Sequence, residues 1–344
     1  MFFMSTAKIK KRVLITGPAP ENVGGISMHI RRLVNVMADR CEFDFVDEAR
    51  NRTNGYFNLR SCNIFRYIKK VICADVVHIN SGAFLLRAFN IFMCALVFRK
   101  YTVVTIHRDP SMEPHNGIMR WLLSNCNVVI NVNETGHNIF KTEGKCDYRL
   151  LPAYLPPNLD VEPKLPHDVS VWLEHVRKDT KAVVMCNNAS NLLMHDGVDL
   201  YGTDLCVAAV NELPKNYYLV FVVVKCEIPE FYDAYHVAIA KYGLEDRILL
   251  TDKSMSFVRL ISESDIVLRT TNTDGDSITV REALALGKPV VASDVVARPE
   301  GTTLFANRNV ASLIKAIVEV CGQKVTPVTD NTDYAAIYSE FYRL

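Results

Sequence analysis

The segment 269–292, RTTNTDGDSITVREALALGKPVVA, holds the residues whose types and order could do chemistry. An apolar run ends just before it, and a turn leads to Ser277, a favourable N-cap for a helix over 277–286. Asp274 and Glu282 bracket that helix, whose first backbone N–H groups can bind an anion. One carboxylate on sugar hydroxyls, the helix end on a diphosphate and the second carboxylate on a ribose would form a coherent nucleotide-sugar site.

A second candidate is the glycine-containing loop at 17–26, GPAPENVGGI, which follows a predicted strand and precedes a predicted helix. Gly24 and Gly25 let backbone N–H groups approach an anion at the positive end of that helix. The loop fits neither the dinucleotide fingerprint G-x-G-x-x-G nor the P-loop, which needs Lys-Ser/Thr after the glycine. It indicates either an anion-binding loop or an ordinary tight turn.

Three histidines are placed near predicted strand ends or on the first helix. His78 and His107 each end a predicted strand, and His29 lies on the helix after the glycine loop. Ligands of open parallel sheets bind beyond the carboxyl ends of the strands, where a histidine can hydrogen-bond a hydroxyl or stabilise a developing charge. We expect this role for His107, with strand capping as the alternative. Capping is favoured for His78, and a structural role for His29.

These side chains need elements that hold them at sheet edges, and the chain provides short β-branched runs alternating with helical patterns. The predicted strands are 12–16, 42–46, 76–79, 102–106, 128–132, 148–151, 182–185, 218–224, 247–250, 265–268 and 289–292. The predicted helices are 27–37, 59–72, 84–98, 117–123, 134–140, 205–213, 229–242, 257–262, 277–286, 311–320 and 333–344. Apolar strands separated by helices indicate parallel sheets covered on both faces, hence a doubly wound α/β fold.

The chain of 344 residues is long enough for two domains, and a proline-rich stretch marks where they should divide. Five prolines fall within 152–166, where neither a helix nor a strand interior is expected. We predict a Rossmann-like domain over 1–160, a second over 161–325, and a C-terminal helix in 326–344.

The near-neutral total of 39 basic and 38 acidic residues argues against a dedicated nucleic-acid binder, and it hides a division. Residues 1–160 carry 21 basic and 13 acidic side chains, net +8, whereas residues 161–344 carry 18 and 25, net −7. The basic amphipathic stretch 59–70 indicates either docking on an anionic membrane or a solvated helix.

The remaining composition favours a cytoplasmic protein. Ten cysteines are scattered singly, without the spacing of a zinc site, as expected for core residues in a reducing compartment. The first residues make a poor signal peptide. The apolar stretch 83–98 is interrupted by polar residues and is shorter than the ~20 residues that a bilayer span needs.

At 274–292 the sequence resembles glycosyltransferase family 4, retaining enzymes of the GT-B fold. Their E-x7-E motif with E-A-x-A-x-G-x-P-V-V-A has its counterpart in Asp274 and the run from Glu282 to Ala292, with Asp in place of the first Glu. The variant T-D-G-D-S-x-x-x-R-E-A-L, with R-P-E-G at 298–301, is similar to a branch found in bacterial surface-polysaccharide and O-antigen synthesis. Weaker likeness extends to G-G-I-x-x-H at 24–29, T-I-H at 105–107, D-L-Y-G at 199–202 and G-L-E-D-R at 243–247.

The resemblance implies two Rossmann-like domains facing each other across a cleft, and it allows the C-terminal helix to return to the first domain. It implies catalytic roles for three residues: His107 at the transferred sugar, Asp274 on the sugar hydroxyls and Glu282 on the ribose. It assigns the donor diphosphate and base to a set at three places in the sequence: Gly24, Gly25, Gly275, Asp276, Ser277, Ile278, Thr279, Lys253, Ser254 and Met255.

Two departures from the family pattern bear on donor binding. The family usually supplies an Arg and a Lys to the diphosphate early in the second domain, and residues 187–197 contain neither. Arg269 or Lys225, each at a predicted strand end, could replace them or could form structural ion pairs. If nothing replaces them, donor binding is weak or activity is lost. The shorter Asp274 could shift donor preference or be a subfamily habit.

The sequence therefore predicts a metal-independent retaining glycosyltransferase that needs no cofactor and uses a nucleotide sugar, favouring a UDP-sugar. No carboxylate is identifiable as a covalent nucleophile, so we expect front-face transfer assisted by the leaving diphosphate. The acceptor would be a glycan or lipid-linked glycan, reached from the cytoplasmic face of the inner membrane.

Four alternatives stay open. The D-x-D pattern formed by Asp274 and Asp276 resembles the metal motif of the other major glycosyltransferase fold. An epimerase or hydrolase of the same fold would need no acceptor. An NAD(P)-dependent Rossmann oxidoreductase is disfavoured by the missing glycine fingerprint and the missing Tyr-x-x-x-Lys pair. A non-catalytic binding subunit would explain the missing cations.

Overall fold

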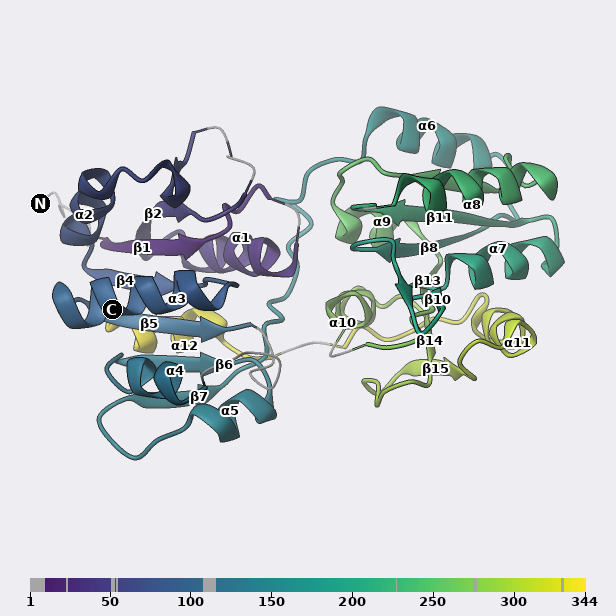
Figure 1. The fold of residues 1–344 in the computed structure, drawn as a ribbon. Coiled ribbons are helices and arrows are strands. Elements are labelled where there is room, and N and C mark those ends of the chain that lie inside the picture. The colour runs from purple at the N-terminus through teal and green to yellow at the C-terminus, as the bar shows by residue number, and fades with distance from the viewer. Residues whose placement is uncertain are drawn as a thin grey trace, which may run out of the picture. The chain divides into compact units, whose positions relative to one another are not determined.

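The computed structural model describes residues 10–22, 24–50, 53, 55–107, 116–226, 228–274, 277–328 and 331–344. These residues form two compact units (Figure 1). The first consists of Met1–Leu155 together with Thr332–Leu344, and the second of Pro156–Asn331. The chain passes between them inside the proline-rich stretch, and its last helix returns to the first unit.

The first unit is built on a seven-stranded parallel sheet with the order β3-β2-β1-β4-β5-β6-β7. Its strands are β1 (Lys11–Gly17), β2 (Cys41–Asp47), β3 (Phe57–Asn58), β4 (Val76–Ile79), β5 (Tyr101–Ile106), β6 (Val128–Asn131) and β7 (Asp147–Leu150). The order reverses between β1 and β4, which makes their carboxyl ends the switch point where doubly wound sheets bind ligands.

Alternate residues of these strands face two separate cores. Leu14, Val77 and Val104 pack under the helical layer of α2 (Ile64–Cys73), α3 (Phe84–Ile91) and α4 (Asn116–Leu123). The same layer includes α5 (Glu134–Phe140), the 3-10 turn η1 (Leu59–Ser61) and the π-helical segment η2 (Phe92–Val97). Val13 and Val103 face the opposite core, under α1 (Gly25–Met37) and the C-terminal α12 (Tyr334–Tyr342). The period of two in the strands explains why both faces need helices.

The second unit has a six-stranded parallel sheet with the order β12-β11-β8-β13-β14-β15. Its strands are β8 (Val183–Ala189), β11 (Tyr217–Val223), β12 (Ile248–Thr251), β13 (Ile266–Arg269), β14 (Val290–Ser293) and β15 (Thr302–Phe305). A short hairpin, β9 (Met194–His195) and β10 (Val198–Asp199), precedes the first crossover helix. The switch point lies between β8 and β13.

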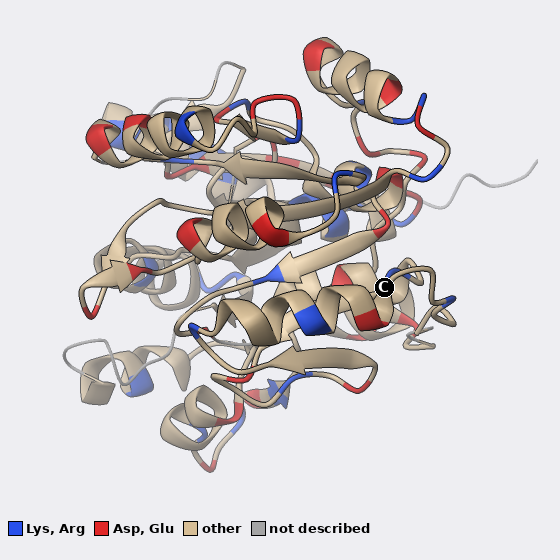
Figure 2. Cartoon of the chain, turned by 90° about the vertical axis from the view of Figure 1, so that its right-hand side faces the viewer, with Lys and Arg blue, Asp and Glu red and all other residues tan. Residues whose placement is uncertain are grey.

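Helices again cover both faces of this sheet. One core contains α7 (Thr203–Glu212), α8 (Pro229–Lys241) and α11 (Val310–Val320), and the other contains α6 (His167–Val176), α9 (Phe257–Glu263) and α10 (Ile278–Ala285). Acidic positions, red in Figure 2, recur on several helices of this unit. No helix within the described ranges is long and apolar enough to cross a membrane.

The predicted α/β fold with two parallel sheets is confirmed, and most element boundaries agree within two residues. The predicted helix 59–72 is instead divided into η1 and α2, because Asn63 accepts a hydrogen bond from the Arg66 N–H and caps α2. The predicted helix 84–98 changes to π geometry at Phe92. Helix α6, strand β15 and the β9–β10 hairpin were not predicted.

Candidate functional site

The connection from β13 to α10 lies at the switch point of the second unit. Strand β13 pairs with β8, and its last residue, Arg269, is followed by the turn that leads into α10. Ser277 has the extended backbone of an N-cap, as the sequence predicts. Gly275 and Asp276, both assigned to the donor site, lie outside the described residues.

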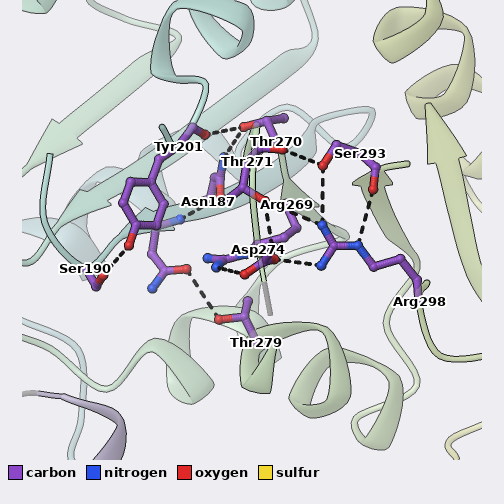
Figure 3. A network of polar contacts seen from close by, with 11 residues as sticks. Asn187, Ser190, Tyr201, Arg269, Thr270, Thr271, Asp274, Thr279, Ser293 and Arg298 are labelled. Atoms are coloured by element: carbon purple, nitrogen blue, oxygen red, sulfur yellow. Dashed lines mark hydrogen bonds and ion pairs between the residues drawn. The ribbon is translucent and has the colours of Figure 1, made fainter. Parts of the chain in front are cut away.

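Asp274 is held between two guanidinium groups, as Figure 3 shows. Arg269 donates to both carboxylate oxygens, at 2.9 and 2.8 Å, and Arg298 donates to Oδ2 at 2.6 Å. The Asp274 side chain is only 8% exposed. Burial would raise the pKa of this carboxyl, but the two arginines hold it below its usual value. Asp274 is therefore ionised at neutral pH, and the three side chains together keep one positive charge.

Hydrogen bonds on both sides of the Arg298 guanidinium, to Asp274 and to the end of β14, hold this side chain in place. Its Nε donates to the Ser293 carbonyl at 3.2 Å, and Ser293 Oγ donates to the Thr271 carbonyl at 2.6 Å. The Arg298 side chain is 2% exposed, less than that of Arg269 at 12%. The buried Arg298 thus anchors Asp274 to the end of β14, and Arg269 presents the more accessible cation. Of the two roles expected for Arg269, the ion pair is the one formed here.

Asparagines at the end of β8 occupy the place where the family pattern has cations. Thr279 Oγ1 donates to Asn188 Oδ1 at 3.4 Å, which links the first turn of α10 to β8. Asn187 Nδ2 donates to Thr270 Oγ1 at 2.9 Å. These amides supply hydrogen-bonding groups but no positive charge beside the helix N-terminus (Figure 3).

A tight approach of backbone to backbone completes the edge of the site. Gly202 caps α7 with a φ of +67°, and a Cβ there would lie 2.4 Å from the Thr270 carbonyl oxygen. Asp199 fixes this loop by accepting from the N–H groups of Tyr201 and Thr203, each at 2.8 Å. Only glycine fits at this position.

Ser277 and Glu282 lie at the start and on the second turn of α10, and both are buried. Ser277 Oγ has no hydrogen-bond partner within the part of the chain that the structure describes. A buried hydroxyl without a partner at a helix N-terminus, where the first backbone N–H groups lack intrahelical partners, is suited to a phosphate oxygen.

The residues assigned to the base lie in the loop between β12 and α9. Lys253 Nζ pairs with Asp168 of α6 at 2.7 Å, Ser254 is exposed and Met255 packs against the core beneath α9. Lys225 is exposed just beyond β11, where its carbonyl accepts from the Leu192 N–H at 2.8 Å. The structure therefore places Lys225 at the same carboxyl edge as Arg269.

In the first unit, the glycine loop ends at the N-terminus of α1. Gly24 has a φ of +142° and open space where a side chain would be, and Gly25 begins the helix. Asp47, at the end of β2, holds the start of the loop by accepting from the Ala19 N–H at 3.0 Å. The loop therefore leads directly into the N-terminus of α1, at the switch point of this unit.

His107 follows β5 and is half-buried beside His29, with ring centroids 5.0 Å apart. Its Nε2–H donates to Asn80 Oδ1 at 2.9 Å. Burial, and then the neighbouring His29, His78 and Arg87, lower the pKa of His107 well below its usual value. His107 is neutral at neutral pH, so with its Nε2–H donated to Asn80 the ring can accept a hydrogen bond at Nδ1 but provides no fixed positive charge.

The other two histidines are interior residues of the first unit. His78 is fully buried, hydrogen-bonded to the Tyr342 hydroxyl at 2.7 Å and to Thr105 Oγ1 at 2.8 Å. His29 Nδ1 donates to the Ala153 carbonyl at 2.8 Å. Burial lowers the pKa of His78 to about 3 and that of His29 to about 4. Both are structural, as the sequence favours.

Within the described ranges, no three His, Cys, Asp or Glu side chains are grouped so that they could hold a metal ion. The D-x-D alternative depends on Asp276, which lies outside those ranges.

Sequence reasoning missed Arg298 and Asn188 as members of this cluster. Arg298 lies 24 residues after Asp274, and Asn188 lies 91 residues before Thr279. Neither pair leaves a local spacing signal. The only available hint was the R-P-E-G run itself, which was noted as a family feature and not as part of a site.

The second unit also carries a recognisable family pattern. Residues 195–323 match the family described as Glycosyl transferases group 1. This stretch includes β13, Asp274, Arg298 and α10. The match supports glycosyl transfer as the chemistry of this unit. No curated protein matches the chain by sequence.

Solved structures match the chain over nearly its full length. HepE of Anabaena in complex with UDP has a TM-score of 0.63 at 14% identity, covering 96% of this chain and 95% of that one. The fold is GT-B. A GT-B glycosyltransferase from Rickettsia africae gives 0.60 at 15% identity, covering 97% and 92%. A putative UDP-N-acetylglucosamine 2-epimerase from Listeria monocytogenes gives 0.57 at 15%, covering 98% of both chains. Because GT-B proteins differ in reaction, activity has to be argued from the site.

Proposed function

We propose that this chain transfers a sugar from a nucleotide-sugar donor to a glycan or lipid-linked glycan acceptor, with retention of configuration. The observation that carries the proposal is the glycosyltransferase group 1 match over the segment that contains the α10 N-terminus and its arginine–aspartate cluster. A UDP-sugar is the favoured donor, since HepE is similar in fold and has been crystallised with UDP and with UDP-glucose.

The donor diphosphate would sit at the N-terminus of α10. The helix end, the Ser277 hydroxyl and the net positive charge of Arg269, Asp274 and Arg298 would stabilise the negative charge that develops on the leaving group. This arrangement compensates for the missing Arg and Lys of residues 187–197. Glu282 would hold the ribose, and the Lys253–Met255 loop the base.

The side chain proposed to orient the sugar in the second unit is Asp274. Both Asp274 oxygens accept from arginine, so a sugar hydroxyl would meet a carboxylate whose orientation is already fixed. The first unit has two groups of its own suited to a sugar donor: the Nδ1 of neutral His107, which could accept from a sugar hydroxyl, and the Gly24–Gly25 helix entry, which suits an anion. Without a carboxylate nucleophile, the leaving diphosphate would take the acceptor proton in a front-face transfer that needs no metal.

The cellular setting is part of the proposal. Surface-polysaccharide or O-antigen synthesis, at the cytoplasmic face of the inner membrane, would supply both the nucleotide sugar and a lipid-linked acceptor. Its support is the resemblance of the 274–301 segment to that branch of the family.

A panel of nucleotide sugars, first by thermal shift and then by transfer and hydrolysis assays, tests the function. We expect Asp274→Asn and Glu282→Gln each to reduce turnover by roughly 10²–10³-fold, since each replaces a carboxylate that would accept from sugar or ribose hydroxyls by a neutral amide. Asparagine is preferred to alanine at 274, because loss of the side chain would leave two guanidiniums unpaired and destabilise the unit.

The matched control is Glu230→Gln, an exposed carboxylate on α8, which should retain wild-type turnover. Wild-type rates in both site variants would rule out the proposed donor site. Product analysis with donor alone separates transfer from epimerisation or hydrolysis, the alternative that the GT-B likeness to a putative epimerase keeps open.

A further inference from the structure

The helical layer formed by η1–α2, α3–η2 and α4 presents large apolar side chains outward. Its inner side packs on the sheet of the first unit, as expected, yet Phe65 is 83% exposed, Leu85 78% and Trp121 57%. We define this apolar face by Phe65, Ile72, Leu85, Phe92, Ile118 and Trp121. A helix on a water-facing surface normally carries polar residues outside, so helices that are apolar on both sides indicate a covering partner.

The exposed residues follow helical spacing, so they form stripes and are not scattered. On α2, Phe65 and Ile72 lie seven residues apart with Lys69 between them, and all three are exposed. Leu85 on α3 and Phe92 at the start of η2 are exposed at the same interval of seven, with the partly buried Phe89 between them. Residues at i, i+4 and i+7 share one side of a helix.

A hollow joins the two stripes. It has a volume of about 300 Å³ and is lined by Leu59, Cys62, Asn63 and Ile64 beside α2 and by Leu86 and Phe89 of α3. The face is therefore continuous from α2 to α3, and α3 in turn contacts α4.

The charge of these elements has a single sign. Residues 59–73 and 84–100 contain no Asp or Glu, but they contain Arg60, Lys69 and Arg99, all exposed. Three basic side chains of the layer are also engaged locally: Arg60 Nε donates to the Glu48 carbonyl at 3.3 Å, Lys70 pairs with Asp44, and Lys100 donates to the carbonyls of Ile72 and Ala74. An apolar face flanked by positive charge complements an anionic, apolar partner.

We propose that this face docks on an anionic lipid bilayer, with the aromatic and leucine side chains in the interface and the basic side chains on lipid headgroups. A second copy of the chain fits poorly, because the same positive charges would be brought together. An anionic bilayer provides both an apolar environment for the exposed apolar side chains and negative headgroups for the basic ones. The docking stands on this surface alone and does not depend on the donor site.

Vesicle co-sedimentation of the full chain, without any nucleotide sugar, tests the proposal. We expect binding to phosphatidylcholine vesicles that contain phosphatidylglycerol, and much weaker binding to phosphatidylcholine alone. Arg60→Gln with Lys69→Gln should lower the partition coefficient about 25-fold, since each basic residue near the surface is worth about five-fold. Raised salt should remove this difference.

Phe65→Ser with Leu85→Ser should lower binding at least ten-fold at low and at high salt. Both side chains are mostly exposed, so the fold should be kept, and circular dichroism verifies this. The matched control is Val237→Ser with Val318→Ser, exposed apolar residues of α8 and α11, which should bind like wild type.

Two results would overturn the proposal. One is equal vesicle binding by wild type and the Phe65/Leu85 variant. The other is no vesicle binding by wild type; if light scattering then showed a dimer that the same variant abolishes, the face would be a contact between copies. Because the assay contains no donor, failure of the proposed transfer reaction would not affect its outcome.

Discussion

At the scale of single residues, two buried carboxylates differ in their partners: Asp274 is paired with arginines, and Glu48 is hydrogen-bonded to neutral side chains. Asp274 and Arg298 are buried in one ion-paired cluster, and Arg269, its more exposed member, pairs with the same carboxylate and lies over the Tyr201 ring, 5.5 Å from the centroid. Glu48, just beyond β2, is different: it is 6% exposed, and its Oε1 accepts from two neutral groups, Ser81 Oγ at 2.7 Å and Asn90 Nδ2 at 2.6 Å. Burial raises its pKa to about 7, against the lowering effect of those two bonds.

Glu48→Gln should change the pH dependence of stability of the first unit. The folded-state pKa of Glu48 is raised above its unfolded value, so its favourable contribution is present below about 4.5 and is lost as pH rises through about 7. The free energy of unfolding of the variant minus that of wild type should therefore increase by up to about 3 kcal/mol from about pH 5 to about pH 8. Urea unfolding at the two pH values measures this. Glu42→Gln, an exposed position on β2, is the control, and an equal gain there would contradict the assignment.

At the scale of elements, local sequence predicts α12 as a helix, and its tertiary contacts place it in the first unit. Tyr334, Tyr338, Phe341 and Tyr342 are all buried against the face of the sheet that α1 covers only in part. Its attachment is polar as well: Lys11 Nζ donates to the Tyr342 carbonyl at 2.9 Å, and Arg40 donates to Ser339 Oγ at 2.6 Å. The helix is an integral layer of a unit whose main part ends at Leu155, 177 positions before Thr332.

Tyr342→Phe should destabilise the first unit by about 1–3 kcal/mol, because it leaves the buried Nδ1 of His78 without its hydroxyl partner while keeping the ring. Urea unfolding measures the loss. Tyr242→Phe, at a half-exposed tyrosine after α8, should lie within about 0.5 kcal/mol of wild type. Equal stability of both variants would mean that the His78 bond contributes nothing.

At the scale of the whole molecule, the division of charge follows the division of the fold. Counted over the structural units, the first carries 22 basic and 14 acidic residues, net +8, and the second 17 and 24, net −7. The positive unit bears the apolar face. The negative unit bears the proposed diphosphate site, so local features must bind the anion: a helix end and two guanidiniums over one carboxylate.

The two units should differ in their ability to fold alone. Residues 156–331 contain both cores of their sheet and should unfold cooperatively as a fragment. Residues 10–155 lack α12 and should not, since four buried aromatic residues at about 1.5–3 kcal/mol each approach the ~5–15 kcal/mol stability of a domain. Circular dichroism with thermal unfolding distinguishes the fragments.

The control for this prediction is the same fragment with residues 332–344 joined after residue 155 by a flexible linker, which should restore cooperative unfolding. A cooperative transition in residues 10–155 alone would contradict the role given to α12.

Neighbouring residues by themselves determined most of the elements and both ends of α10. The strands Val76–Ile79 and Val128–Asn131 read as apolar runs, and Ser277 and Gly287 bracket α10, because burial periodicity and capping act over a few residues. The two-residue hairpin turn at Asp196–Gly197 had such a local signal and was overlooked. Helix α6 begins at His167, directly after the proline-rich stretch. The prolines before it favoured a linker, so the start of this helix was not predicted.

Only the tertiary structure decided which side chains meet. Asp274 joins Arg298, Asn188 joins Thr279 and His78 joins Tyr342, across 24, 91 and 264 residues. Parallel sheets bring distant strand ends to one edge, so partners are chosen by strand order and helix packing and not by spacing along the chain. The sequence therefore predicted a nucleotide-sugar site at α10. The packing of β8, β13 and β14 determined that its aspartate is held by two arginines.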